Sequence, residues 1–116
     1  MDVHVTRQDS EGVPVVAVHG GLDLTTAATL REALIEAIDE NPGRQVVVDL
    51  EGVDFIDSAG LGVLLGGRDR ARDGDGELVL VVTGRNVLKV LELTGLTRVF
   101  DIHPSRAAAV GRSPTR

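Results

Sequence analysis

The feature that most constrains this chain is the stretch of residues 46–65, VVVDLEGVDFIDSAGLGVLL. It opens with three consecutive valines, and a short β-branched run of this kind is typical of a buried strand. After Ser58, three leucines recur at helical spacing (Leu61, Leu64 and Leu65). Residues 49–57 are therefore expected to carry the chain off the strand end, and the Ser58 hydroxyl is expected to cap the helix. Ser58 should lie where a strand gives way to a helix, ringed by acidic residues.

The rest of the chain predicts the same alternation of strands and helices. Besides 46–48, the segments expected to form strands are residues 3–6, 13–18, 78–82 and 99–102. Residues 20–24 are expected to form a loop. Helices are expected over residues 27–38 after a Thr25 or Thr26 cap, from Ser58 to a break at 73–76, over 87–91 and over 105–110. The order β-β-α-β-α-β-α-β-α predicts an α/β fold with a mixed sheet and helices packed against it.

Composition narrows the possible functions. The chain has 116 residues, enough for one domain with a single core. Its formal charge of −6 argues against nucleic acid or an anionic membrane as a partner, and two Phe without Trp or Tyr offer little surface for stacking. The lack of cysteine excludes disulfides and thiolate metal sites, and the histidines have no metal-ligand spacing. We therefore expect neither a metal nor a cofactor.

Domain limits and location follow from similar observations. The first ten residues have neither a basic segment nor an apolar segment, and no apolar run approaches membrane-spanning length. A cytoplasmic protein is expected. We expect one domain over residues 1–110, followed by a disordered polar tail over residues 111–116.

The helix after Ser58 contains four glycines, Gly60, Gly62, Gly66 and Gly67. Each costs a helix about 1 kcal/mol relative to alanine. One explanation is close packing on the sheet, with the Gly66-Gly67 pair marking a kink or an early end. The other is that Gly60 and Gly62 leave the helix start bare, so that the backbone of another protein can approach Ser58. Both explanations stay open, because they concern different glycines.

Three blocks of sequence resemble a known family. They are GGLDLTTAATL, then VVVDLEGVDFIDSAGLGVLL, then VLKVLELTGLTRVFDIHPSRAAAV, and together they span nearly the whole chain. In this order they resemble the STAS domain of anti-sigma factor antagonists, and the core DSAGLG at residues 57–62 is specific to that family. The resemblance implies a STAS-type mixed β-sheet of four to five strands with helices mainly on one side.

The resemblance also implies a function without catalysis. The serine matching Ser58 is phosphorylated by a partner that is both an anti-sigma factor and a GHKL-type serine kinase. The unphosphorylated antagonist binds that partner and frees the sigma factor, the phosphorylated form lets go, and a PP2C-type phosphatase resets it. The residues expected to contact the partner are Leu22, Asp23, Thr25, Asp54, Asp57, Ala59, Gly60 and Leu61. Asp57 is equally compatible with holding the loop through backbone N–H groups.

Two residues depart from the pattern of the family. Ala59 stands where many relatives have a second serine, which leaves Ser58 as the acceptor within the motif. Gly21 stands where relatives often carry an acidic residue, which predicts an altered partner preference.

Two other classes of function compete with this interpretation. A hydrolase with a nucleophile elbow also places a serine between a strand and a helix, but that motif needs glycine two residues before the serine, and this chain has Ile56 there. A non-switching STAS module, either a signalling scaffold or an accessory subunit of a lipid transporter, would share the fold. Its partners would not include a GHKL-type kinase.

Overall fold

The computed structural model describes residues 4–111. Its strands are β1 (His4–Ser10), β2 (Val13–Leu22), β3 (Gln45–Ile56), β4 (Glu77–Val81) and β5 (Asp101–His103). Its helices are α1 (Ala27–Glu40), α2 (Ser58–Asp73), α3 (Arg85–Leu93) and α4 (Arg106–Gly111), with a 3-10 turn η1 (Leu96–Arg98) after α3. This order is the predicted one. The disordered tail was predicted over residues 111–116, but Gly111 is the last residue of α4, and residues 112–116 lie outside the described residues.

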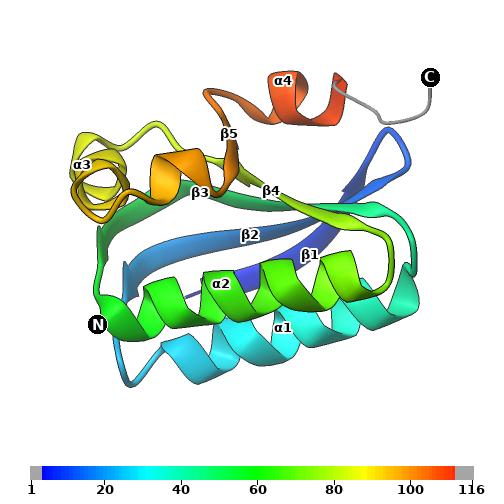
Figure 1. Ribbon diagram of the computed structural model, residues 1–116, viewed down its shortest axis with the longest axis horizontal. Helices are drawn as coiled ribbons and strands as arrows, with labels where there is room; N and C mark the ends of the chain where they lie inside the picture. The colour runs from blue at the N-terminus through cyan, green and yellow to red at the C-terminus, as the bar shows by residue number, and fades with distance from the viewer. Residues whose placement is uncertain (1–3, 112–116) are drawn as a thin grey trace.

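The strands form one mixed sheet in sequence order, β1-β2-β3-β4-β5. Only β1 and β2 are antiparallel, because they are joined by a tight turn at Glu11 and Gly12, which both have positive φ. The later strands run parallel, since a helix or a longer connection returns the chain to the same end of the sheet each time. All their carboxyl ends therefore meet at one edge of the domain, on the left in Figure 1.

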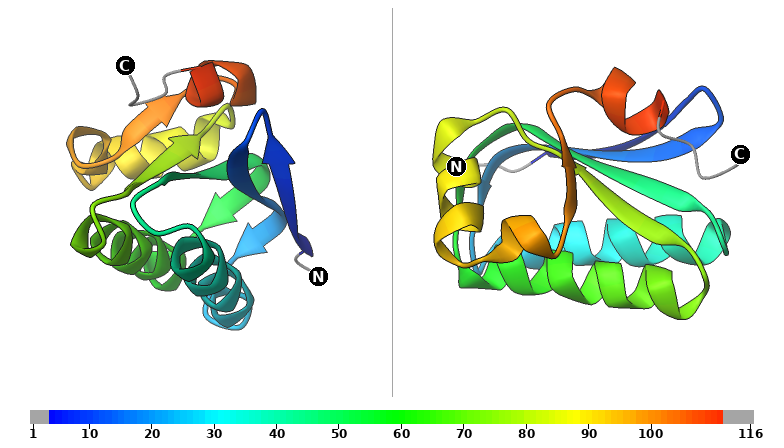
Figure 2. Two further views of the ribbon diagram at one scale, coloured as in Figure 1. Left: turned by 90° about the vertical axis from the view of Figure 1, so that its right-hand side faces the viewer. Right: turned by 45° about the horizontal axis from the view of Figure 1, so that its top comes forward.

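Two helical layers of unequal size cover the sheet. The long helices α1 and α2 lie side by side on one face, and the short α4 lies on the other (Figures 1 and 2). The main core lies between the sheet and α1 and α2, and it contains Leu30, Leu34 and Leu64. A smaller cluster joins Ala109 and Val110 of α4 to valines of β2, β3 and β4. The prediction of a mixed sheet with its main helical layer on one side is confirmed.

Strands β2 and β3 are longer than predicted. Residues 20–22, predicted to be a loop, belong to β2, and residues 49–56, predicted to leave the strand, continue β3. The two strands stay paired to their ends through the pairs Gly21–Phe55 and Leu22–Ile56, despite two irregularities in register. The irregular register breaks the alternation of apolar and polar residues, which is the signal that sequence reasoning relies on.

Helix α2 continues to Asp73, so its end at the predicted break of residues 73–76 is confirmed, and the open explanation of an early end at Gly66 and Gly67 is wrong. Gly67 is buried against α1 and β4, where a Cβ atom would lie 3.1 Å from Leu34 Cδ1 and 3.6 Å from Leu78 Cδ2. Gly66 faces open space. The close approach of α1 and α2 thus accounts for Gly67, and the packing of the helix, rather than its propensity, decides how far it runs.

Candidate functional site

Ser58 is the first residue of α2 and its side chain is exposed. The prediction that its hydroxyl caps the helix is wrong. Asp57 is the N-cap, and its Oδ1 atom accepts hydrogen bonds from the backbone N–H groups of Ala59 at 2.9 Å and Gly60 at 3.2 Å. A carboxylate satisfies these free donors at least as well as a hydroxyl. Within residues 4–111 the Ser58 hydroxyl makes no hydrogen bond, so it is free to react with another molecule.

Asp23 organises the neighbouring turn, between β2 and α1. Its Oδ1 atom accepts hydrogen bonds from the Thr25 hydroxyl at 2.7 Å and from the backbone N–H groups of Thr25 at 3.0 Å and Thr26 at 3.1 Å. The Thr25 hydroxyl, followed by these other donors, holds the pKa of Asp23 below its ordinary value. Thr26 is the N-cap residue of α1, one of the two predicted, but its hydroxyl makes no capping hydrogen bond. The hydroxyl instead donates to the Gly21 carbonyl at 2.9 Å and accepts from the Asp23 N–H at 3.0 Å. The turn is therefore held by its own polar groups.

The sheet brings the two turns together. The Asp57 N–H donates to the Leu22 carbonyl at 3.0 Å, which continues the pairing of β2 and β3 by one step beyond Ile56. The start of α2 and the β2–α1 turn consequently lie at the same end of the domain (Figure 1). In open α/β sheets this edge, outside the carboxyl ends of parallel strands, is where ligands usually bind.

The predicted contact residues divide into an exposed and a buried group. Asp54 and Thr25 are exposed, while Asp23, Asp57 and Ala59 are half-buried. The side chains of Leu22 and Leu61 are buried in the main core, and Gly60 is buried too. The side chains of Leu22 and Leu61 therefore hold the two turns to the core, and the contact of these two residues with a partner stays a prediction.

The two glycines near Ser58 have different surroundings. A Cβ atom on Gly60 would lie 2.8 Å from Ile56 Cγ1 and 3.0 Å from Leu22 Cβ, closer than such atoms can normally approach. Gly60 is thus required by packing, in contrast to the predicted role in keeping the surface bare. A Cβ atom on Gly62 would meet nothing within 4 Å. Gly62 therefore agrees with the second explanation, an open surface at the helix start.

Two exposed apolar side chains at this edge were not singled out from the sequence. Leu24 lies in the β2–α1 turn and Phe55 near the end of β3, and they are 78% and 52% exposed. Phenylalanine in a strand normally predicts core, so only the register of β3 shows that this side chain is exposed. A shallow groove lined by residues 51–54 and 84–86 connects Asp54, next to Phe55 in the chain, to the start of α3. Its Arg85 was not singled out either.

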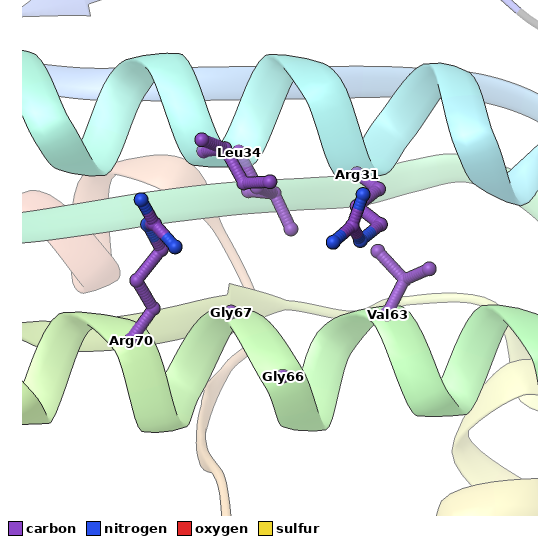
Figure 3. Close-up of a pocket in the computed structure, with 7 residues that line it drawn as sticks. Arg31, Leu34, Val63, Gly66, Gly67 and Arg70 are labelled. Carbon is purple, nitrogen blue, oxygen red and sulfur yellow. The ribbon is translucent and has the colours of Figure 1, made fainter.

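A second hollow, of about 120 Å³, lies between α1 and α2. Leu34, Ile35 and Val63 line it together with two glycines, and the side chains of Arg31 and Arg70 lie at either end (Figure 3). Arg70 makes two hydrogen bonds to Asp39, at 2.8 and 2.9 Å, so its charge is already paired. None of the predicted site residues lines this hollow.

Two further findings concern metals and membranes. Within residues 4–111, no group of three or more His, Asp or Glu side chains is arranged to hold a metal ion. No helix in the same part of the chain is long and apolar enough to cross a membrane.

A mixed five-stranded sheet, two long helices on one face and an exposed serine at the start of the second of them define the class of this protein. The family model described as "STAS domain" matches residues 4–109, and the chain belongs to that family. The resemblance noted in the sequence is thereby confirmed.

Among its relatives are proteins named as anti-sigma factor antagonists. The chain is 35% identical to the anti-sigma-F factor antagonist RsfB of Mycobacterium tuberculosis over 100 residues, which cover 86% of this chain and 80% of that one. It is 28% identical to the anti-sigma F factor antagonist of Paenibacillus polymyxa over 110 residues, or 95% of this chain and 94% of that one. A crystal structure of an anti-sigma factor antagonist from Mycobacterium paratuberculosis superposes with a TM-score of 0.87 at 28% identity, covering 97% of this chain and 94% of that one.

Proposed function

We propose that this protein is an anti-sigma factor antagonist whose binding is switched by phosphorylation of Ser58. In this proposal the unphosphorylated form binds an anti-sigma factor that is also a GHKL-type serine kinase, and so releases a sigma factor. Phosphorylation ends the binding, and a PP2C-type phosphatase restores it. The protein acts by binding and not by catalysis, in the cytoplasm where its partners regulate transcription.

The observation that carries this proposal is the exposed, unbonded hydroxyl of Ser58 at the edge where the two turns meet. A kinase can reach such a hydroxyl without unfolding the domain. The names of relatives at 28–35% identity, matched over 80–94% of their length, support the choice of partner. The lack of a base hydrogen-bonded to Ser58 within residues 4–111 supports a phosphate acceptor over a hydrolase nucleophile, which is activated by an adjacent base.

The electrostatics of the edge support release on phosphorylation. A phosphoserine adds about −1.5 to −2 charge at neutral pH. The Asp57 carboxylate already accepts hydrogen bonds from the backbone N–H groups of Ala59 and Gly60, so a phosphate on Ser58 would stand beside an anion, at an edge of the domain that also carries Asp54 and Asp23. Like charges brought together at an interface cost several kcal/mol, and each ~1.4 kcal/mol is a tenfold change in affinity. We therefore expect phosphorylation to weaken partner binding by about 100-fold or more.

The test starts with the protein from its native cells. Its intact mass, measured with and without phosphatase treatment, should show one phosphate, and fragmentation should locate it on Ser58. Proteins that co-purify with the unphosphorylated form should include a GHKL-type kinase. A transporter ATPase in its place, with Ser58 unmodified, would favour the non-switching STAS module.

Variants then separate charge from folding. Ser58→Asp should lose most of the affinity for the co-purified kinase, and Ser58→Ala should keep it but accept no phosphate. Ser10→Asp is the matched control, because it adds the same charge where β1 ends, at the opposite end of β2 from Leu22. If phosphorylated protein bound the kinase as tightly as unphosphorylated protein, the charge argument would be refuted.

A further inference from the structure

Few large apolar side chains are exposed among residues 4–111, and two of them lie at one edge of the domain. Leu24, Phe55 and Leu93 are the exposed ones within residues 4–111. A single exposed leucine needs no explanation, but apolar side chains gathered at one site commonly mark a binding surface. Leu24 lies in the β2–α1 turn and Phe55 near the end of β3, at the edge that carries Ser58, and Leu93 is the last residue of α3.

Phe55 is held in place by its pairing with Gly21. The two residues are partners in the β2–β3 ladder, and a Cβ atom on Gly21 would lie 3.5 Å from Phe55 Cδ2. Leu22 and Ile56, the next pair, point into the main core, so Gly21 and Phe55 face the opposite side of the sheet. Any side chain at residue 21 would cover this edge of the ring. Glycine leaves the ring open on a rigid strand, at little cost in entropy when a partner covers it.

Leu24 is presented by a turn that is already ordered. Its neighbours Asp23, Thr25 and Thr26 are tied together by the hydrogen bonds described above, while the Leu24 side chain is 78% exposed. A side chain held outward in this way loses less freedom on binding than one on a mobile loop. It therefore has the features of a preorganised apolar contact.

Carboxylates accompany both apolar side chains. Asp23 precedes Leu24 directly, Asp54 precedes Phe55, and Asp57 follows two residues later. Interfaces with this composition have an apolar centre, which supplies most of the affinity, and a charged rim, which selects partners of opposite charge. The complementary surface is an apolar depression rimmed by Lys or Arg.

We propose that Phe55 and Leu24 are the apolar anchors that hold the anti-sigma factor, inserting into an apolar depression with a basic rim, and that Gly21 sets partner choice by keeping Phe55 uncovered. This inference rests on the proposed function and assigns separate roles to the residues of the site. The apolar anchors supply affinity, and the charge on Ser58 controls it.

The experiment measures the dissociation constant of the unphosphorylated full chain for the GHKL-type kinase that co-purifies with it, by calorimetry with purified proteins. Truncation of a binding anchor commonly costs about tenfold or more, so we expect a loss of about 30-fold for Phe55→Ala and about fivefold for Leu24→Ala. Leu93→Ala, which removes an equally exposed side chain from α3, should change the constant less than about twofold. Gly21→Glu should weaken the same complex, because it places a carboxylate against the ring.

Two readouts separate a lost anchor from a damaged fold. Circular dichroism should show native structure in every variant, and Phe55→Leu, which keeps an apolar side chain, should retain most of the affinity. If Phe55→Ala folds normally and binds as tightly as the wild type, while phosphorylation still releases the wild type, the anchor proposal is refuted and the proposed function stands. If the wild type retains no anti-sigma factor, both proposals fail.

Discussion

The substitutions Gly60→Ala and Gly62→Ala are expected to change stability in opposite directions. Both glycines lie in α2, and alanine is the better helix former by about 1 kcal/mol. Gly62→Ala meets nothing within 4 Å, so the whole gain in propensity should appear as added stability. We expect the free energy of unfolding to rise by about 1 kcal/mol in this variant.

At residue 60 the same methyl group enters an occupied space. It would lie 2.8 Å from Ile56 Cγ1 and 3.0 Å from Leu22 Cβ, and both of these residues are held in the core by paired strands. Overpacking of this kind costs typically about 1–3 kcal/mol, which exceeds the gain in propensity. We expect Gly60→Ala to lower the free energy of unfolding by about 1 kcal/mol, so the two variants should differ by about 2 kcal/mol.

The measurement is urea denaturation followed by far-ultraviolet circular dichroism, since the chain has no Trp or Tyr for fluorescence. Gly66→Ala is the matched control, because its added methyl group also meets nothing within 4 Å in the same helix. It should behave like Gly62→Ala. If Gly60→Ala stabilised the protein as much as these two, the packing described here for the start of α2 would be incorrect.

Three further predictions concern the polar groups of the fold. Asp57→Ala should lower the free energy of unfolding by about 1 kcal/mol through loss of the helix cap, whereas Ser58→Ala should leave it unchanged, as urea titrations would show. The pKa of Asp23 is lowered in the folded protein, so this group stabilises above pH 3.8 and the contribution is lost as the pH falls below that value. The free energy of unfolding of the wild type should accordingly exceed that of Asp23→Asn at neutral pH, and the difference should disappear on acidification. A difference that grew in acid would contradict the lowered pKa of Asp23. Arg106→Ala should lower the free energy of unfolding by about 2 kcal/mol, because it leaves the buried Asp49 carboxylate without its guanidinium partner at 2.7 Å. The loss should stay below the roughly 3–5 kcal/mol of a fully buried pair, since the arginine side chain is 31% exposed. A melting temperature equal to that of the wild type would show that solvent replaces this ion pair.

The amino-acid sequence alone determined the order of elements and the place of Ser58. Apolar runs such as residues 78–82, and the helical spacing of leucines after Ser58, depend on local periodicity that the fold preserves. The DSAGLG motif also led to the family, because it combines a strand end, a helix start and a serine in six residues.

The tertiary structure decided the features that depend on contacts between residues far apart in the sequence. Asp57, and not Ser58, caps α2 because the pairing of β2 and β3 continues to Leu22 and orients the Asp57 carboxylate toward the helix start. The same pairing places Phe55 beside Gly21, although residues more than thirty positions apart have no local signal that connects them. Gly60 and Gly62 are alike in sequence and differ only in what lies around them. Periodicity gives each segment its type, while exposure at the site depends on long-range register, which forms only when the sheet assembles.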